Sequence, residues 1–213
     1  MSEASKKLIV LSTNGAGIVN GKMDSLRNEV KAVVATVVTV QETHSRRKGR
    51  IQMDDMVVFE SIRTKKGGGT ICAIHQDLDP KLIEEYNDPF ELLVVEVSGN
   101  KRIITRYGPQ ETWEEERRLP FFLKLEEEIV KAVMAGKAVI IEMDANAKLG
   151  KKHIPDDPHE ITQNGKLLEG IIERQNLFVV NGSKKCKGNI TRKRTTKTRV
   201  EESIIDLVLV LVI

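Results

Sequence analysis

The sequence predicts a mixed α/β domain, and three observations lead to that class. Short apolar runs that stop abruptly at polar residues recur along the chain, as expected of strands in a sheet. Segments with apolar residues at helical spacing lie between them. The chain has 213 residues, 40% of them hydrophobic, which is enough for one such domain with a sizeable core. Because no internal repeat or low-complexity linker divides it, we expect a single domain over residues 1–213.

The composition and the N-terminal residues favour an intracellular protein. The net charge of +3 is only mildly basic. Cys72 and Cys186 lie far apart without metal-type spacing, so reduced thiols are the default expectation. The opening residues MSEASKKLIV are too polar for a signal peptide. No apolar run approaches the roughly 20 residues that cross a bilayer, and we therefore expect no membrane partner.

Six strands and one helix are expected in the first half of the chain. Apolar and β-branched runs predict strands over residues 8–12, 36–40, 56–60, 69–75, 91–97 and 102–106. Asp24 is expected to cap a helix that runs to about Ala35. The apolar positions at helical spacing in this helix are Leu26, Val30, Val33 and Val34. Three glycines, residues 67–69, predict a flexible turn in which backbone can approach a partner closely.

A long helix begins the second half. Thr112 and Glu115 have the spacing of a capping box, and the helix is expected to run to Ala135. Pro120 should kink it. The side chains expected to point inward are Leu119, Phe122, Leu123, Leu125, Ile129 and Val133. A strand over 138–141, a helix over 166–175, a strand over 177–180 and a last strand over 203–213 follow.

The stretch IIEMDANAKLG, residues 140–150, is the first candidate for a functional site. An apolar strand ends there in Asp144-Ala145-Asn146. A carboxylate and a carboxamide two residues apart at a strand end can point into one cleft from a rigid support. That arrangement suits a site where an anionic phosphoester meets a hard cation. The alternative is a polar turn after a core strand, because Asp and Asn are favoured in turns.

Four further polar residues stand at strand ends or within strands: Asn14, Glu42, Tyr107 and Asp206. Each has a structural alternative. Asn14 fits a turn, Glu42 a solvated strand end, Tyr107 a core-edge aromatic, and Asp206 a buried hydrogen-bond partner. Gathered at one edge of stacked sheets, these positions would together supply a metal carboxylate, phosphate donors and a base.

The order of the segments TNGAGI, QETH, GGGTICAIH, RYGPQE, MDANAKLG and SIIDLVL resembles the endonuclease/exonuclease/phosphatase superfamily. The resemblance is closest to the apurinic-type endonuclease domains of non-LTR (LINE-like) retrotransposons, and it extends from Leu8 to Val210. It implies a four-layer α-β-β-α sandwich in which two mixed sheets pack face to face.

The resemblance also implies a role for each site residue. Glu42 would be the principal ligand of a single Mg²⁺ or Mn²⁺, with Asn14 beside it. Tyr107 and Asn146 would hold the scissile phosphate, and Asp144 would orient or deprotonate the attacking water. Asp206 would orient a histidine. Such roles are chemically consistent, because Mg²⁺ prefers oxygen ligands and a positioned carboxylate can activate water.

Three departures from the family pattern stand out. Family members carry a Ser-Asp-His element beyond the Asp206-type motif, and this chain stops first, at Ile213. DNA-repair members place an acidic residue where Ala16 stands, and Glu142 replaces the usual glycine. We therefore expect a C-terminally truncated domain that lacks its last strand, with weak activity or none. The segment LVLVLVI is then expected to form an exposed, aggregation-prone edge.

Basic loops predict a nucleic-acid partner. Residues 184–199 hold eight Lys or Arg and no acidic residue, and the segments 46–50 and 63–66 are basic as well. Such loops attract a phosphate backbone without sequence choice. The alternatives for 184–199 are a solvated surface or a nuclear-localisation patch. The candidate DNA-binding residues are Arg46, Arg47, Lys48, Arg50, Lys65, Lys66, Arg192, Lys193 and Arg194.

Three functions remain open from the sequence. The first is a metal-dependent DNA endonuclease of retrotransposon origin, which we expect to act in the nucleus. Its parent element would then be able to encode a reverse transcriptase domain as well. The second is a small-molecule phosphoesterase of the same fold. The third is a catalytically impaired nucleic-acid-binding remnant. Aromatic groups are scarce, and Trp113 is expected at a helix start, so stacking on single strands has little support.

Overall fold

The computed structural model describes residues 8–15, 17–18, 22–63, 67–184, 186, 192–195 and 200–211, with backbone alone for 192–195 and 200–203. The chain divides into two compact units, Met1–Tyr107 and Gly108–Ile213. The single domain expected from the sequence stays a prediction.

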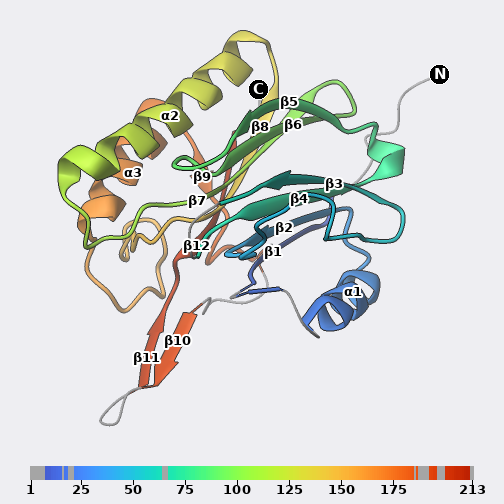
Figure 1. Cartoon of the computed structure of the whole chain (residues 1–213). Helices are drawn as coiled ribbons and strands as arrows, with labels where there is room; N and C mark the ends of the chain where they lie inside the picture. The colour runs from blue at the N-terminus through green and yellow to red at the C-terminus, as the bar shows by residue number, and fades with distance from the viewer. Residues whose placement is uncertain are drawn as a thin grey trace. The chain divides into compact units, whose positions relative to one another are not determined.

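The first unit contains a four-stranded sheet in the order β1-β2-β4-β3 (Figure 1). Its strands are β1 (Val10–Asn14), β2 (Val37–Gln41), β3 (Met56–Ser61) and β4 (Thr70–His75). Strands β1 and β2 are parallel, which requires a crossover, and helix α1 (Lys22–Val33) supplies it. The other pairings are antiparallel. All of β2 is buried, as its β-branched run predicts.

Three more antiparallel strands complete the first unit: β5 (Lys81–Tyr86), β6 (Leu92–Val97) and β7 (Lys101–Tyr107), after the short helix η1 (Gln76–Leu78). Strand β4 packs against β6 and β7. The opposite face of the sheet packs on α1, where Leu26 joins Val38, Val40 and Ile71 in one core cluster. The first unit thus has a helix layer and two strand layers.

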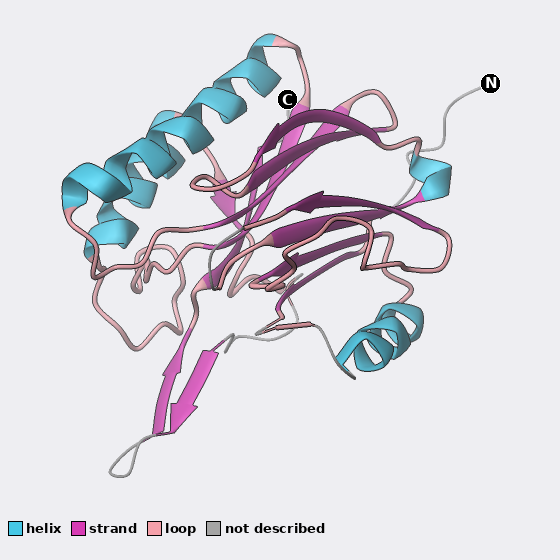
Figure 2. Ribbon diagram, in the orientation of Figure 1, coloured by secondary structure: helices cyan, strands magenta, loops and turns pink. Residues whose placement is uncertain are grey.

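The second unit contains three antiparallel strands, β8, β12 and β9, and two helices, α2 and α3. Figure 2 draws strands in magenta and helices in cyan. Strand β12 (Asp206–Leu211) lies between β8 (Ala138–Asp144) and β9 (Phe178–Val179). Helix α2 (Glu115–Met134) packs against β8 and against α3 (Gln163–Arg174). Strands β10 (Arg192–Thr195) and β11 (Val200–Ser203) form a separate antiparallel ribbon.

The predicted helix caps were wrong. Helix α1 begins at Lys22, so Asp24 lies in its first turn and does not cap it. Helix α2 begins at Glu115 after an N-cap residue, Glu114, that makes no side-chain capping bond. A turn closed by the hydrogen bond from Trp113 N to Gln110 O (3.1 Å) precedes the helix and holds Thr112 outside it. Pro120 is accommodated inside the helix.

The predicted inward face of α2 was partly wrong. Phe122, Leu125 and Ile129 are buried, but Leu119, Leu123 and Val133 are 37%, 54% and 37% exposed. Their expected places belong to other residues, because α2 also buries Arg118, Phe121, Glu128 and Ala132. Helix α1 shows the same error. Leu26 is buried, whereas Val33 and Val34 are exposed, and Val34 lies past the helix end with φ +54°.

The predicted exposed edge at the end of the chain was wrong for the described part of the segment. Strand β12 pairs along its whole length with β8, and Leu209 and Val210 pair with β9 on its other side. Beyond β9, Val180 N donates to Val208 O (2.8 Å) and Val208 N donates to Asn181 Oδ1 (2.8 Å). Both sides of β12 are therefore hydrogen-bonded.

Strand β5, whose residues are half-buried or exposed, was missed because its sequence has no clear apolar alternation.

Cys72 and Cys186 do not form a disulfide, and burial raises the pKa of Cys186. Within the described ranges, no helix is both long and apolar enough to cross a bilayer.

Candidate active site

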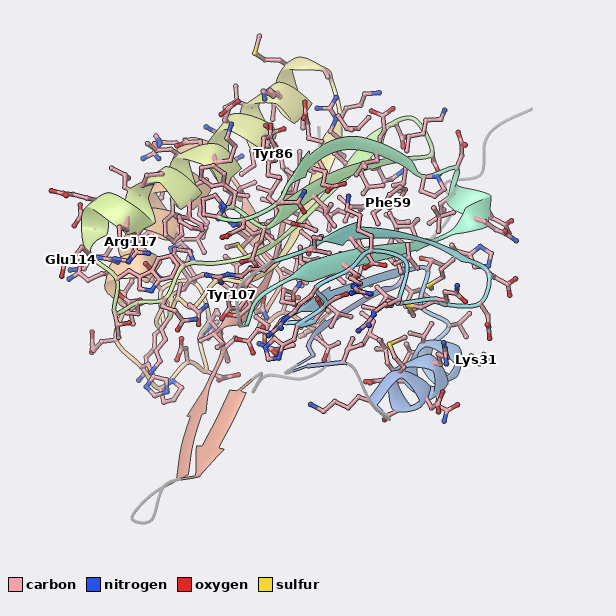
Figure 3. All side chains as sticks on the ribbon, in the orientation of Figure 1. Lys31, Phe59, Tyr86, Tyr107, Glu114 and Arg117 are labelled. Carbon is pink, nitrogen blue, oxygen red and sulfur yellow. The ribbon has the colours of Figure 1, made fainter. Side chains whose placement is uncertain are left out.

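Glu42 and Tyr107, which stand 65 residues apart in sequence, meet in the first unit. Glu42 follows β2 directly and adopts φ +53°, and Tyr107 is the last residue of β7. The Tyr107 hydroxyl donates a hydrogen bond of 2.6 Å to Glu42 Oε1 (Figure 3, where Tyr107 is labelled). Hydrogen bonds to a charged acceptor are the stronger kind. Two predicted site residues are thus held together by their own side chains.

Asn14 lies at the same strand edge as Glu42. It ends β1 and stands in register with Gln41, the last residue of the parallel neighbour β2. The chain beyond β1 then folds over the end of β2, because Gly15 N donates to Gln41 O (2.7 Å) and Gly17 N donates to Glu42 O (2.8 Å). The structure therefore brings Asn14, Glu42 and Tyr107 together within one unit.

The glycine run 67–69 contacts the residues that follow Glu42. Thr43 N donates to Gly69 O (3.1 Å) and His44 N donates to Gly68 O (2.9 Å). Gly69 adopts φ +84°, and a Cβ there would lie 2.5 Å from Thr43 Oγ1. The sequence predicts a close backbone approach at these glycines, and within the described residues the partner is the site's own main chain.

Glu91 is a site residue that sequence reasoning missed. Its side chain is buried, and it accepts from Gly69 N (2.5 Å) and pairs with Arg63 Nη1 (3.1 Å). Its main-chain oxygen accepts from Tyr107 N (3.2 Å). Burial raises the pKa of Glu91. Burial also lowers the pKa of Arg106 to about 9, although the negative charge of Glu91 acts to raise that pKa. The signal was present, since a single carboxylate opens the otherwise apolar run 91–95.

In the second unit, Asp144 and Asn146 form a tight turn at the end of β8. Asp144, nearly fully buried, accepts from Asn146 N at Oδ1 (3.0 Å). Asn146 adopts φ +45°, a conformation that Asn tolerates better than most residues. Its Nδ2 donates to Gly108 O (3.1 Å). The turn interpretation of this segment is therefore confirmed, and the interpretation of Asp144 and Asn146 as site residues stays a prediction.

Asp206 lies beside this turn. It is the first residue of β12 and stands in register with Asp144 on β8. Ala145 N donates to Ile205 O (2.9 Å), and Asn181 Nδ2 donates to Asp206 O (3.0 Å). The structure therefore brings Asp144, Asn146 and Asp206 together within the second unit.

The segment after Tyr107 needs a glycine at position 108 because the backbone there contacts the turn after β8. Gly108 N donates to Asp144 O (2.7 Å). A Cβ at Gly108 would lie 2.7 Å from Ala145 O and 2.8 Å from Asp144 O, so any side chain would push the turn away. The Asp144–Asn146 turn thus rests directly on the backbone of residue 108.

The candidate DNA-binding residues differ in their surroundings. Arg46, Arg47, Lys48 and Arg50 are exposed, although Lys48 pairs with Glu85 (2.5 Å). The loop is fixed by Gly49 N, which donates to Glu60 Oε1 (2.9 Å), and burial raises the pKa of Glu60. Lys65 and Lys66 lie outside the described residues. Arg192, Lys193 and Arg194 belong to β10, and their side chains are likewise outside what is described.

The histidines and Glu142 lie in different surroundings. His75 lies near Asp77 and His153 near Glu169, each within ion-pair distance, while His44 is exposed. Glu142 is fully buried on β8. Within the described ranges, no group of three or more His, Cys, Asp or Glu side chains gathers as a metal cluster.

Solved structures share this fold over most of the chain. The endonuclease domain of TRAS1, a telomere-specific non-LTR retrotransposon, matches with a TM-score of 0.68 and 18% identity, over 95% of this chain and 84% of that one. An AP endonuclease from Archaeoglobus fulgidus matches with a TM-score of 0.71 and 17% identity, over 96% and 86%. The 3' phosphatase NExo from Neisseria, bound to product DNA hairpin, matches with a TM-score of 0.71 and 13% identity, over 94% and 85%.

These likenesses confirm the predicted fold class. The chain shares the four-layer α/β sandwich fold of these solved structures, as the order of its segments predicts. No family model and no curated protein matches the sequence. At identities below 20%, the likeness establishes the fold, and the activity has to be argued from the site.

Proposed function

We propose that this protein is a divalent-metal-dependent phosphodiesterase that nicks the DNA backbone. Asn14, Glu42 and Tyr107 of the first unit and Asp144, Asn146 and Asp206 of the second unit are its proposed site residues. The observation that carries the proposal is the 2.6 Å hydrogen bond between Tyr107 and Glu42. It joins the two residues to which the family resemblance gives the roles of metal ligand and phosphate contact. A polar pair at a strand edge, with a second set of carboxylates and an amide in the other unit, suits phosphoester hydrolysis.

The residues around Glu42 fit a hard cation. Tyr107 occupies Oε1 of the carboxylate, and no described residue donates a hydrogen bond to Oε2. Asn14 contributes a carboxamide at the neighbouring strand end. Mg²⁺ is commonly held by one or two carboxylates together with waters, so a three-carboxylate cluster is not needed. When bound, Mg²⁺ or Mn²⁺ would neutralise charge on the phosphoryl oxygens.

The second unit supplies the groups for water and phosphate. Asp144 is a carboxylate fixed at the end of a strand, where it can orient or deprotonate water. Asn146 Nδ2 has two N–H groups, and the described structure uses one of them on Gly108 O. The other can donate to a phosphate oxygen. Asp206, in register with Asp144, would hold a neighbouring donor in place.

DNA is the proposed substrate because basic residues follow Glu42 closely in the sequence. Arg46, Arg47 and Arg50 follow Glu42 within eight positions and are exposed, so they can contact a phosphate backbone. We extend the proposal to retrotransposon origin and a nuclear site of action. The segment order described above and the basic run at 184–199 support these extensions.

Nicking of supercoiled plasmid in Mg²⁺ or Mn²⁺ tests the proposal. We expect the wild type to convert plasmid to open circles, and Glu42→Ala and Asp144→Ala each to lower the rate by about 10²–10⁴-fold. The matched control is Glu173→Ala, a carboxylate of α3 that is largely exposed and accepts a hydrogen bond from Lys152. It should nick at the wild-type rate.

Other outcomes would contradict the proposal in distinct ways. Salt-dependent DNA binding without nicking by any variant would identify a nucleic-acid-binding remnant. Phosphate release from small esters, without DNA binding, would identify a small-molecule phosphoesterase. Nicking that survives in both Glu42→Ala and Asp144→Ala would place the active site elsewhere.

A further inference from the structure

Asn164, at the start of α3, is the hub of a buried hydrogen-bond network in the second unit. Its side chain is fully buried. Nδ2 donates to Pro109 O (2.9 Å) and to Asn146 O (3.1 Å). Oδ1 accepts from Arg118 Nη1 of α2 (2.9 Å). The carboxamide therefore uses both of its donors and its acceptor, and it joins the segment after Tyr107, the turn at Asn146 and helix α2.

The local sequence fixes Asn164 in this place. Thr162 caps α3 by accepting from Gly165 N (3.3 Å), and it also accepts from Lys148 N (3.2 Å). A Cβ at Gly165 would lie 2.1 Å from Lys148 O, so glycine is required for this approach. Asn164 N donates to Glu111 Oε1 (3.1 Å). The helix start is therefore held against the chain on both sides of Asn164.

The network closes a ring around Asn146. Asn146 Nδ2 donates to Gly108 O, Asn164 Nδ2 donates to Pro109 O, and the same Nδ2 donates to Asn146 O. Asn146 has an unfavourable positive φ of +45°, which needs support from its surroundings. Asn164 belongs to α3, and its side chain holds one carbonyl group of the segment after Tyr107, that of Pro109, and one of the turn after β8, that of Asn146.

We propose that Asn164 is a positioning residue for catalysis, which sets the orientation of the Asn146 carboxamide toward the scissile phosphate. This inference rests on the proposed function. Asn164 acts through Asn146 and the 108–109 backbone and does not itself meet substrate. Misplacing a catalytic group by about 1 Å can cost about 10²-fold in rate, so a buried residue behind the site can matter as much as one in it.

Asn164→Asp is the sharpest variant. It keeps the size of the side chain, the acceptor for Arg118 and the main-chain bond to Glu111, but it replaces a double donor with an oxygen that faces two carbonyl groups. We expect kcat for nicking to fall about 10- to 100-fold while KM for DNA changes little. Asn164→Ala removes the same donors without adding charge, and it serves if the Asp variant does not fold.

The matched control is Asp157→Ala. Asp157 is also fully buried in the second unit. Its carboxylate accepts from Gly150 N (3.3 Å) and His159 N (3.0 Å), so its printed bonds lie within residues 150–159 of the same connection and do not include Asn146. We expect this variant to lower the melting temperature as Asn164→Ala does and to leave kcat unchanged. An equal loss of kcat in both variants would reduce Asn164 to a structural role and overturn the proposal.

A double-mutant cycle tests the route of the effect. In an Asn146→Ala background the carboxamide is absent, so Asn164→Asp should cost less than twofold more in kcat. Independent losses that multiply would overturn the proposal.

Amide NMR tests the positioning without any need for nicking. In Asn164→Ala, the side-chain NH₂ resonances of Asn146 should move toward the values of free Asn, and in Asp157→Ala they should not. Unchanged Asn146 resonances would overturn the positioning role even in an active enzyme. Shifted resonances in a protein whose wild type does not nick would retain that role and overturn the nuclease activity alone.

Discussion

The candidate site residues form two groups, the first half in the first unit and the second half in the second unit, and each group is held together in a different way. In the first unit, Glu42 meets Tyr107 from 65 residues away, and the glycine run 67–69 braces the two residues after Glu42. In the second unit, Asp144 and Asn146 stand two residues apart in one turn. The first half is therefore assembled by long-range contacts, and the second half begins from local backbone geometry. Loop changes far from Glu42 in sequence should consequently disturb the first half.

The largest effect in this comparison is expected from Gly69→Ala. The alanine would have to adopt φ +84°, and its Cβ would lie 2.5 Å from Thr43 Oγ1. Thr43 is itself buried. We expect a loss of about 3 kcal/mol in the free energy of unfolding, from left-handed strain together with the clash. Urea unfolding of the variant measures it.

Gly99→Ala is the control for this prediction. It has a similar φ of +66°, with nothing within 4 Å of its Cβ position, so it should cost only about 1 kcal/mol. Equal losses in the two variants would mean that the contact between the glycine run and Thr43 contributes nothing, and the brace on the first half would have to be abandoned.

Tyr107→Phe should give the next largest effect. It removes the hydroxyl that donates to Glu42 and keeps the ring that is buried in the first unit. We expect kcat for plasmid nicking to fall about 10²-fold, as when one donor at a reacting oxyanion is removed. Tyr86→Phe is the matched control, because Tyr86 is the other tyrosine of the chain and lies outside the candidate site, on β5. Full activity of Tyr107→Phe would show that the Glu42 contact is only structural.

The difference between the halves also decides what the sequence could predict. Asp144 and Asn146 were found from one strand end, because a carboxylate and an amide in a turn leave a local pattern. Glu42 and Tyr107 were found as separate strand ends, but the bond between them depends on how β2 and β7 pack. Glu91 was missed although its carboxylate opens an otherwise apolar run. Asn164 was missed because its hydrogen bonds reach Pro109 and Arg118, which are distant in sequence.

The helix faces show a second physical limit of the sequence. Helix α2 contains more apolar residues than its buried face can hold, so periodicity alone does not select the face. Arg118 takes an inward position because Asn164 accepts its hydrogen bond. Glu128 is inward while bonded to Lys131 (2.7 Å). Charged residues with partners are therefore buried on α2, while Leu119 and Leu123 are exposed.

The smallest effect tests how Glu91 supports the first half. Because burial raises the pKa of Glu91, the folded protein binds this proton more tightly than the unfolded chain does. The resulting stability is fully present below the unfolded pKa, about 4.3, and is lost as pH rises through the folded pKa. The free energy of unfolding of the wild type, relative to Glu91→Gln, should therefore decline across that window.

Glu126→Gln tests a group whose contribution to the free energy of unfolding changes with pH in the opposite direction. The hydrogen bond from Arg174 lowers the pKa of Glu126, so its contribution is present above the unfolded pKa and is lost as pH falls through the folded value. Urea titrations of the three proteins from about pH 3 to about pH 7 compare the two slopes. A wild-type advantage over Glu91→Gln that grows with pH would show that Arg63 and the Gly69 amide outweigh burial. Glu91 would then brace the first half as a charged anchor throughout the physiological range.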